Sequence, residues 1–306
     1  MVIDLDQEDI RDTVLTSIFG NDYLYDKLTL KGGNALALQG VNARASQDLD
    51  FSVPHGIDLD QRTYEPIFKD SLSNGFNAKG YKVINFIFTP KPSKKNKYVQ
   101  KQNSLNNSSN VIWGGYHIRF GIIEHNLYNK LLQSKTKNMG AHAETIAGDK
   151  KSIEIDISKD EYTKNREKKD LNGFTIYIYT PLMIVYEKVR ASCQQLPEYK
   201  VNGPKERSRD LFDIYELTST NSGLLEQVTN QNNIDILIQM FTIKMVDFEL
   251  LTKLDSYTEQ LRSDYQNNVI PQIKTAEKPS FNFLMDYSKR LFDQLYILIQ
   301  KQQNDF

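Results

Sequence analysis

A glycine pair followed by two aspartates is the pattern in this sequence best suited to do chemistry. Gly32 and Gly33 precede Asp48 and Asp50, with fourteen residues between Gly33 and Asp48. Because glycine has no Cβ, such a pair lets backbone N–H groups come close to a bulky anion. Carboxylates on alternate residues of a strand point to one side, where they repel each other unless a cation lies between them. The pattern predicts a site for Mg²⁺ and the phosphates of a nucleotide.

The neighbouring residues predict the elements that position these groups. Asn34 can cap a helix beginning at Ala35, and the N-terminus of that helix would add positive potential towards the same anion. Leu49 and Phe51 alternate with the aspartates, so a strand over residues 48–53 is expected to bury its other side. The alternative is an ordinary turn followed by an acidic surface strand.

This segment resembles the signature of the nucleotidyltransferase superfamily, which is a glycine pair, a helix and Asp-x-Asp. More narrowly, the run from Arg44 through Ser46 to Asp48 and Asp50 is similar to the AbiEii/AbiGii (MenT-like) toxin family of abortive-infection and toxin–antitoxin systems. The spacing is slightly longer than usual there, and Asn34 stands where Ser or Thr is commoner. The resemblance implies that Gly32, Gly33 and Asn34 cradle a triphosphate. It also implies that Arg44 and Ser46 contact phosphate, unless Arg44 only clamps the turn.

A further strand is predicted where isoleucines alternate strictly with acids over residues 152–157. This alternation indicates a half-buried strand with Glu154 and Asp156 on its polar side. In the family fold such a strand lies beside the Asp-x-Asp strand and offers a third carboxylate, for the metal or for the nucleophile. Asp156 is the expected ligand with Glu154 second, because the family places this acid near the end of the strand. The alternative is a strand whose acidic side only faces solvent.

A second constellation lies on two predicted helices. The first is started by Pro181 and carries an apolar stripe with Lys188 at its edge, where the ammonium could neutralise phosphate. The alternative is a surface lysine whose stem alone is covered. The next helix carries Asp210 and Asp213 on a face shared with apolar residues, so both carboxylates need partners.

The order of these two helices strengthens the resemblance. Glu187-Lys188-Val-Arg-Ala, followed by Arg209-Asp210-Leu-Phe-Asp213, is similar to the second signature of the AbiEii family. The resemblance implies that Lys188 stabilises the transferred phosphate and that Asp210 is the base or orients Lys188. It spans roughly residues 30–217 and covers neither the loop 91–110 nor the tail beyond 220.

Composition and charge are typical of a cytoplasmic globular protein. The 306 residues are 39% hydrophobic and 25% charged, and no apolar run approaches the ~20 residues of a membrane span. One cysteine and four histidines argue against an internal disulfide and a Cys/His zinc cluster. Between Asp70 and Glu124 there are eight basic residues and no acidic one. This segment is expected either to attract RNA or to be a solvated loop.

We therefore expect an α+β fold with two domains. Residues 1–180 would form a nucleotidyltransferase-like catalytic domain around a mixed sheet, and residues 181–306 a helical C-terminal domain that contributes Lys188 and Asp210 to the active-site cleft. Helices are expected over residues 7–19 and 125–133, and amphipathic helices over 234–254 and 283–300.

The expected reaction is the transfer of NMP from an NTP to an RNA acceptor, the 3′ end of tRNA. Asp48, Asp50 and Asp156 would hold Mg²⁺, and a cognate antitoxin would be a partner. Three alternatives remain at this point: a nucleotidyltransferase acting on a small molecule such as an antibiotic, a protein kinase acting on the antitoxin, and a nucleotide-binding module without catalysis.

Overall fold

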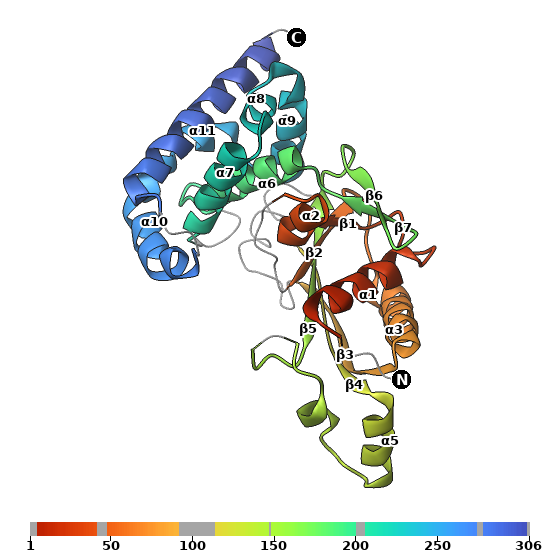
Figure 1. Ribbon diagram of the computed structural model, residues 1–306. Helices are drawn as coiled ribbons and strands as arrows, with labels where there is room; N and C mark the ends of the chain where they lie inside the picture. Colours follow the sequence, from red (N-terminus) through yellow and green to blue (C-terminus); the bar gives the residue numbers. More distant parts are fainter. Residues whose placement is uncertain are drawn as a thin grey trace, which may run out of the picture. The chain divides into compact units, whose positions relative to one another are not determined.

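The computed structural model describes residues 5–41, 48–91, 114–146, 148–199, 206–273 and 278–304. The chain divides into two compact units; among the described residues the first ends at Tyr179, and the second comprises Val41 and the residues from Thr180 onwards. The first unit is built on a sheet and the second from helices (Figure 1), which confirms the expected α+β class.

The first unit contains a seven-stranded mixed sheet with the strand order β3-β4-β5-β2-β1-β7-β6. β2 pairs with β5, and β1 with β7, in parallel, whereas the other neighbours are antiparallel. The strands are β1 (Thr29–Lys31), β2 (Leu49–Pro54), β3 (Tyr81–Lys91), β4 (Gly115–Glu124), β5 (Ile153–Glu161), β6 (Glu167–Leu171) and β7 (Phe174–Ile178). The two acidic strands, β2 and β5, are therefore neighbours near the middle of the sheet.

Two helices, α1 (Gln7–Phe19) and α3 (Gln61–Ala78), lie side by side on one face of this sheet (Figure 1). Phe19 of α1 packs on Phe51 with ring centroids 6.2 Å apart, and Phe76 of α3 packs on Phe120 at 5.7 Å. Along β5 the isoleucines are buried and the acids between them are only partly covered, as the alternation predicted. The acidic residues therefore occupy the face opposite the aromatic core.

An excursion between β4 and β5 carries α5 (His125–Gln133), which has the predicted bounds, and a 3-10 turn, η1 (Met139–His142). The buried residues Ile84, Ile123 and Ala143 form a small separate core with partly buried side chains of this excursion. This contact attaches the excursion to β3 and β4.

The second unit consists of helices with short 3-10 turns between them. Its α-helices are α6 (Pro181–Gln194), α7 (Ser208–Thr220), α8 (Leu224–Val228), α9 (Ile234–Ile243), α10 (Thr258–Asp264) and α11 (Phe281–Asn304). Across the described ranges of both units, no helix is long and apolar enough to cross a membrane.

The helix expected over residues 234–254 is shorter than predicted. Met245 has a φ of 51°, a left-handed conformation that an α-helix cannot continue through. The N–H of Val246 then donates to the carbonyl of Phe241 at 3.0 Å, and the chain goes on as the 3-10 turn Phe248–Thr252. α11, in contrast, contains the whole of the amphipathic stretch 283–300.

Candidate active site

The glycine turn and the second aspartate lie close together in the first unit. Gly32 has a φ of +68°, and a Cβ at this position would lie 3.1 Å from Oδ2 of Asp50. Lys31 and Asp50 are also register partners between β1 and β2. The turn therefore depends on a glycine for two reasons, its left-handed backbone and the space taken by the carboxylate.

Asn34 does not cap the helix, so this prediction is wrong. α2 (Gly32–Leu38) begins two residues before Asn34, which is buried inside it. The Nδ2 of Asn34 donates to the backbone carbonyl of Asp48 at 3.0 Å. The side chain thus connects the glycine helix to the start of the aspartate strand, across thirteen intervening residues.

A row of side chains runs across five neighbouring strands on the acidic face of the sheet. The register aligns Thr89 with His117, His117 with Asp156, Asp156 with Asp50, and Asp50 with Lys31. Directly opposed residues in a sheet point to the same side. The sheet therefore places Asp50 and Asp156 next to each other, as the expected third-acid arrangement requires.

The carboxylate of Asp48 is paired with a lysine. Lys150 donates to Asp48 Oδ1 at 2.7 Å and lies 3.6 Å from Glu154 Oε2. Burial would lower the pKa of the Lys150 ammonium, but its interactions with these two acids outweigh burial and raise the pKa. Asp48 and Glu154 are therefore held close to one shared cation.

Asp156 is held by two basic groups. Its Oδ1 lies 2.8 Å from Lys91 Nζ and 3.0 Å from His117 Nδ1. Burial works to raise the pKa of Asp156, whereas Lys91 and His117 lower it, and the net pKa is below the usual value. Asp156 therefore carries its charge at neutral pH.

The acidic face is suited to a divalent cation. Mg²⁺ in nucleotide sites is bound by one or two carboxylates and completed by phosphate oxygens and water. Within the described ranges no group of three or more His, Cys, Asp or Glu side chains has the geometry to hold a metal ion. Asp48 and Asp50 remain the predicted pair of metal ligands, and the ammonium groups of Lys150 and Lys91 are paired with Asp48 and Asp156.

Lys31 belongs to this face, although the sequence patterns did not single it out. Its side chain is buried, and its Nζ donates to Ser158 Oγ at 3.2 Å. The position of Lys31, immediately before the glycine pair, was the available signal. Arg44 and Ser46, and most of the Lys/Asn-rich stretch 91–110, lie outside the described residues, so their roles stay predictions.

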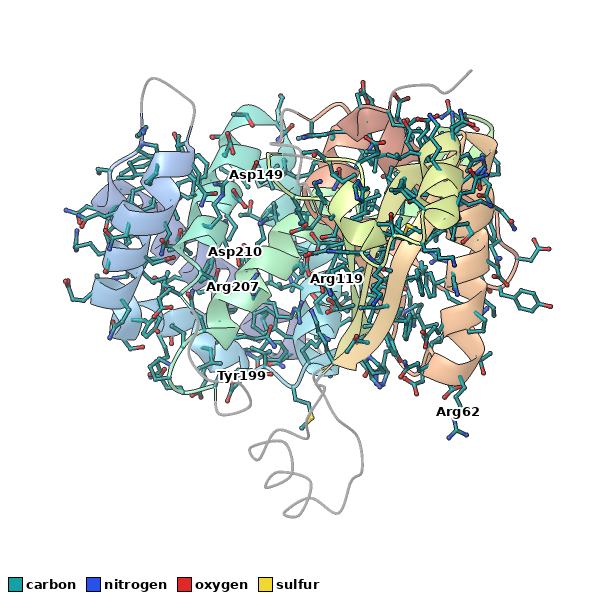
Figure 2. All side chains as sticks on the ribbon, turned by 90° about the horizontal axis from the view of Figure 1, so that it is seen from below. Arg62, Arg119, Asp149, Tyr199, Arg207 and Asp210 are labelled. Atoms are coloured by element: carbon teal, nitrogen blue, oxygen red, sulfur yellow. The ribbon has the colours of Figure 1, made fainter. Side chains whose placement is uncertain are left out.

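The second unit contains a network of five charged side chains around Lys188. Lys188 Nζ donates to Asp210 Oδ1 at 3.0 Å and to Asp213 Oδ2 at 2.7 Å. Arg207 Nε donates to Asp210 Oδ2 at 2.6 Å, and Arg209 Nε to Asp213 Oδ1 at 2.8 Å. Figure 2 shows Arg207 and Asp210 beside each other in this unit. Both acids thus have the partners that their position on an apolar face required.

Local structure explains how this network is held. The side chain of Thr180 caps α6 by accepting from Met183 N at 3.1 Å, and Pro181 occupies the first turn. α7 receives its cap from a distant residue, because Asp264 Oδ2 accepts from the backbone N–H of Ser208 at 3.0 Å. These hydrogen bonds therefore fix the N-termini of α6 and α7, the two helices that carry Lys188 and Asp210.

The charges in this network stabilise each other. Burial disfavours the charged form of Lys188, but Asp210 and Asp213 outweigh it and raise the lysine's pKa above its ordinary value. Burial likewise works to raise the pKa of Asp210, whereas Lys188 and Arg207 lower it, and the net pKa is below its ordinary value. Asp210 is therefore an ionised ion-pair partner over the neutral range.

Comparison with known proteins identifies the family. The sequence profile described as "Nucleotidyl transferase AbiEii toxin, Type IV TA system" matches residues 13–287. No curated protein matches the chain. Among solved structures, JHP933 from Helicobacter pylori is 14% identical, with a TM-score of 0.45 and coverage of 98% of this chain and 94% of that one.

Two other solved structures are more distant. MenT4, a nucleotidyltransferase toxin from Mycobacterium tuberculosis H37Rv, is 12% identical, with a TM-score of 0.37 and coverage of 96% of this chain and 82% of that one. An antigenic nucleotidyltransferase-like protein from Paracoccidioides brasiliensis is 14% identical, with a TM-score of 0.37 and coverage of 84% and 94%. Identity this low carries little weight, so the assignment rests on the profile, which covers most of the sequence. The chain belongs to the AbiEii family of nucleotidyltransferase toxins of type IV toxin–antitoxin systems.

Proposed function

We propose that this toxin transfers a nucleoside monophosphate from an NTP to the 3′ end of an RNA, with tRNA as the acceptor, in a Mg²⁺-dependent reaction in the cytoplasm. The observation that carries the proposal is the close approach of the Asp50 carboxylate to the Gly32 turn, with Asp156 beside Asp50 in the sheet. This arrangement combines an anion-accepting turn with neighbouring carboxylates. A nucleotide's phosphates and their metal need both.

In the proposed reaction, an acceptor hydroxyl oxygen forms a bond to the α-phosphorus of the NTP. The bond between that phosphorus and the oxygen bridging to the β-phosphate breaks, and pyrophosphate leaves. The hydroxyl proton passes to a carboxylate, for which Asp156 is the candidate. When bound, Mg²⁺ would be held by Asp48 and Asp50 and would neutralise charge on the phosphates.

Lys188 is proposed to stabilise the charge that develops on the transferred phosphate. Asp210 is proposed as a positioning residue for Lys188 rather than as the base. Both carboxylate oxygens of Asp210 are engaged in ion pairs, Oδ1 with Lys188 at 3.0 Å and Oδ2 with Arg207 at 2.6 Å. Gly32, Gly33, Arg44 and Ser46 are proposed to contact the triphosphate, while Asn34 holds the helix that carries the turn.

The acceptor is proposed to be RNA because basic residues dominate residues 71–123 and the described excursion that follows carries further lysines. An acceptor without phosphates would gain little from this charge. A cognate antitoxin is proposed to counteract the toxin, as expected for its family.

The proposal is tested by incubating the protein with Mg²⁺, each of the four NTPs labelled at the α-phosphate, and total tRNA. Transfer of label to tRNA is expected with one or a few NTPs, and sequencing of the 3′ ends would identify the added nucleotide. Asp48→Ala and Asp50→Ala should each lower transfer by at least ~100-fold, because each removes a metal ligand. Asp70→Ala, which removes an exposed acid of α3, is the matched control.

The proposal is wrong if no label enters tRNA or any other cellular RNA and Asp48→Ala stays as toxic as the parent protein. Label entering a small molecule but no RNA would support the alternative acceptor class.

A further inference from the structure

A small cavity lies on the acidic face of the sheet, beside the excursion between β4 and β5. Its volume is about 130 Å³. The residues that give it its chemistry are Asn85, Arg119, Gly121, Gly140, Lys151 and Ser152. This volume is below the ~300–1,000 Å³ of pockets that enclose a whole small-molecule ligand. The cavity therefore suits a single small group.

A distortion of β3 forms one wall of this cavity. The pairing register of β3 and β4 shifts between Ile84 and Ile87, and Asn85 within this bulge has a φ of 52°. The Nδ2 of Asn85 lies 2.7 Å from the place that a Cβ on Gly140 would occupy. The bulge thus turns the amide of Asn85 across the cavity towards η1, which is the re-aiming effect that bulges have.

The cavity is lined by two cations and by no carboxylate. Among the described residues, the guanidinium of Arg119 has no hydrogen-bond or ion-pair partner, although Glu154 is its register neighbour on β5. Lys151 Nζ donates only one of its protons, to the carbonyl of Ala141 at 2.6 Å. Two positive side chains and an amide donor around one small space favour an anion with several oxygens.

The strand order places the catalytic acids between this cavity and the glycine turn. β5 and β2, which carry Asp156 and Asp50, have β1 with Gly32 on one side and β4 with Arg119 on the other. Glu154, the register neighbour of Arg119, is two residues from Asp156 along β5, a separation of about 7 Å. The two anion-accepting regions therefore flank the acids from opposite sides.

We propose that this cavity is the subsite for a backbone phosphate of the RNA acceptor strand, with Arg119, Lys151 and Asn85 as its ligands. The inference rests on the proposed function, in which the triphosphate lies at the glycine turn. The acceptor then approaches from the other side of the acids, and the cavity holds one of its phosphates next to the reacting 3′ end. The reaction would accordingly favour acceptors that carry a phosphate near the attacking hydroxyl.

The experiment measures binding and catalysis separately. Binding of a short RNA hairpin with a single-stranded 3′ end is measured by fluorescence anisotropy without NTP or Mg²⁺, for the parent protein, the double variant Arg119→Ala/Lys151→Ala, and Asn85→Gly. Glycine at position 85 keeps the left-handed backbone and removes only the amide. The matched control is Arg62→Ala/Lys69→Ala on α3, where both side chains are exposed and Arg62 extends into solvent (Figure 2).

The double variant should raise the Kd for the hairpin at least ~10-fold at about 0.1 M salt, and should lower the slope of log Kd against log salt by about 0.7 for one phosphate. Asn85→Gly should raise Kd about threefold, and the control less than twofold. In the transfer assay the double variant should raise KM for RNA and leave KM for NTP unchanged.

Equal losses in the double variant and the control would overturn the subsite, as would an unchanged Kd, a parent protein that binds no hairpin, or a rise in the KM for NTP instead. The proposed function fails separately. Hairpin binding that depends on Arg119, in the absence of nucleotide transfer, would support the subsite and reject the proposed reaction. Nucleotide transfer whose KM for RNA is unchanged in the double variant would support the reaction and reject the subsite.

Discussion

Glycine is required at position 32 for two reasons, its left-handed backbone conformation and the nearby carboxylate of Asp50. A side chain at this position would meet both a left-handed φ of +68° and the carboxylate of Asp50 at 3.1 Å. Gly56 has a similar φ of +84° but nothing within 4 Å of its Cβ position. A side chain at Gly56 would therefore introduce backbone strain alone, whereas a side chain at Gly32 would introduce the same strain and also meet the carboxylate of Asp50.

Gly32→Ala should destabilise the protein by about 1–2 kcal/mol, the cost of a left-handed alanine, and should also reduce nucleotide transfer at least ~50-fold because Asp50 must move. Gly56→Ala should have the same cost in stability and keep its activity. Thermal unfolding and initial transfer rates measure the two effects. Equal activity in both variants would show that the Asp50 contact has no catalytic role.

Asp210 has a pH dependence that follows from its ion pairs. Its pKa is lowered in the folded protein, so its contribution to stability is complete above the unfolded pKa of about 3.9 and is lost as the pH falls through the folded value. Asp210→Asn removes the charge and leaves Lys188 and Arg207 with one fewer acidic partner each.

We expect Asp210→Asn to lower the free energy of unfolding at pH 7 by about 3 kcal/mol, as for a broken buried ion pair. The difference from the parent should begin to shrink below about pH 4, where Asp210 of the unfolded chain takes up a proton while the folded parent still holds the charged form. Urea unfolding at pH 7 and at about pH 3 measures both values. A difference that is constant with pH would mean that Asp210 contributes through packing and not through its charge.

Among the elements, α7 depends on a residue far along the chain. Its N-cap position is Arg207, which makes no side-chain cap, and Asp264 of α10 instead accepts from the backbone N–H of Ser208 and also from its hydroxyl. Arg207 immediately precedes α7 and Asp210 lies in its first turn, so the position of the charge network depends on this contact.

Asp264→Ala should therefore cost about 1–2 kcal/mol, the range of a lost helix cap, and should reduce transfer several-fold by loosening the first turn. Asp264→Asn retains an acceptor oxygen and should recover most of the activity. Chemical denaturation and the transfer rate are the measurements. An inactive Asp264→Asn with parental stability would contradict a capping role and point to a need for the charge.

The helix α3 was not predicted from the sequence. Pro66 and Gly75 lie inside this helix, and both residues usually break a helical pattern. In the structure, a Cβ on Gly75 would lie 1.9 Å from Ser17 Oγ of α1, so only glycine allows the two helices to approach this closely. α9 was predicted too long for a related reason, because no sequence pattern marked Met245 as left-handed.

At the scale of the whole molecule, the proposed catalytic groups are divided between the two units. Asp48 and Asp50 lie in the first unit, and Lys188 and Asp210 lie in the second. If each group has its proposed role, nucleotide binding and phosphate transfer should be separable by mutation.

Lys188→Ala should lower kcat for transfer at least ~100-fold, by loss of charge stabilisation, and should change the Kd for an NTP analogue that cannot be cleaved by less than about threefold. Asp48→Ala should weaken binding of the Mg²⁺ form of that analogue. Isothermal titration and single-turnover rates provide the measurements. A Lys188→Ala protein with parental kcat would show that Lys188 of the second unit does not take part in the reaction.

The sequence by itself determined the class of the fold, the bounds of regular elements such as α1 and α5, and the family, because these follow from local periodicity and from motifs of adjacent residues. Only the tertiary structure decided that Asn34 bonds to the strand instead of capping its helix, that Lys31 joins the acidic face, and that Arg119 lines a cavity. The physical reason is that these roles depend on strand register and on contacts between distant residues, which a one-dimensional pattern does not specify.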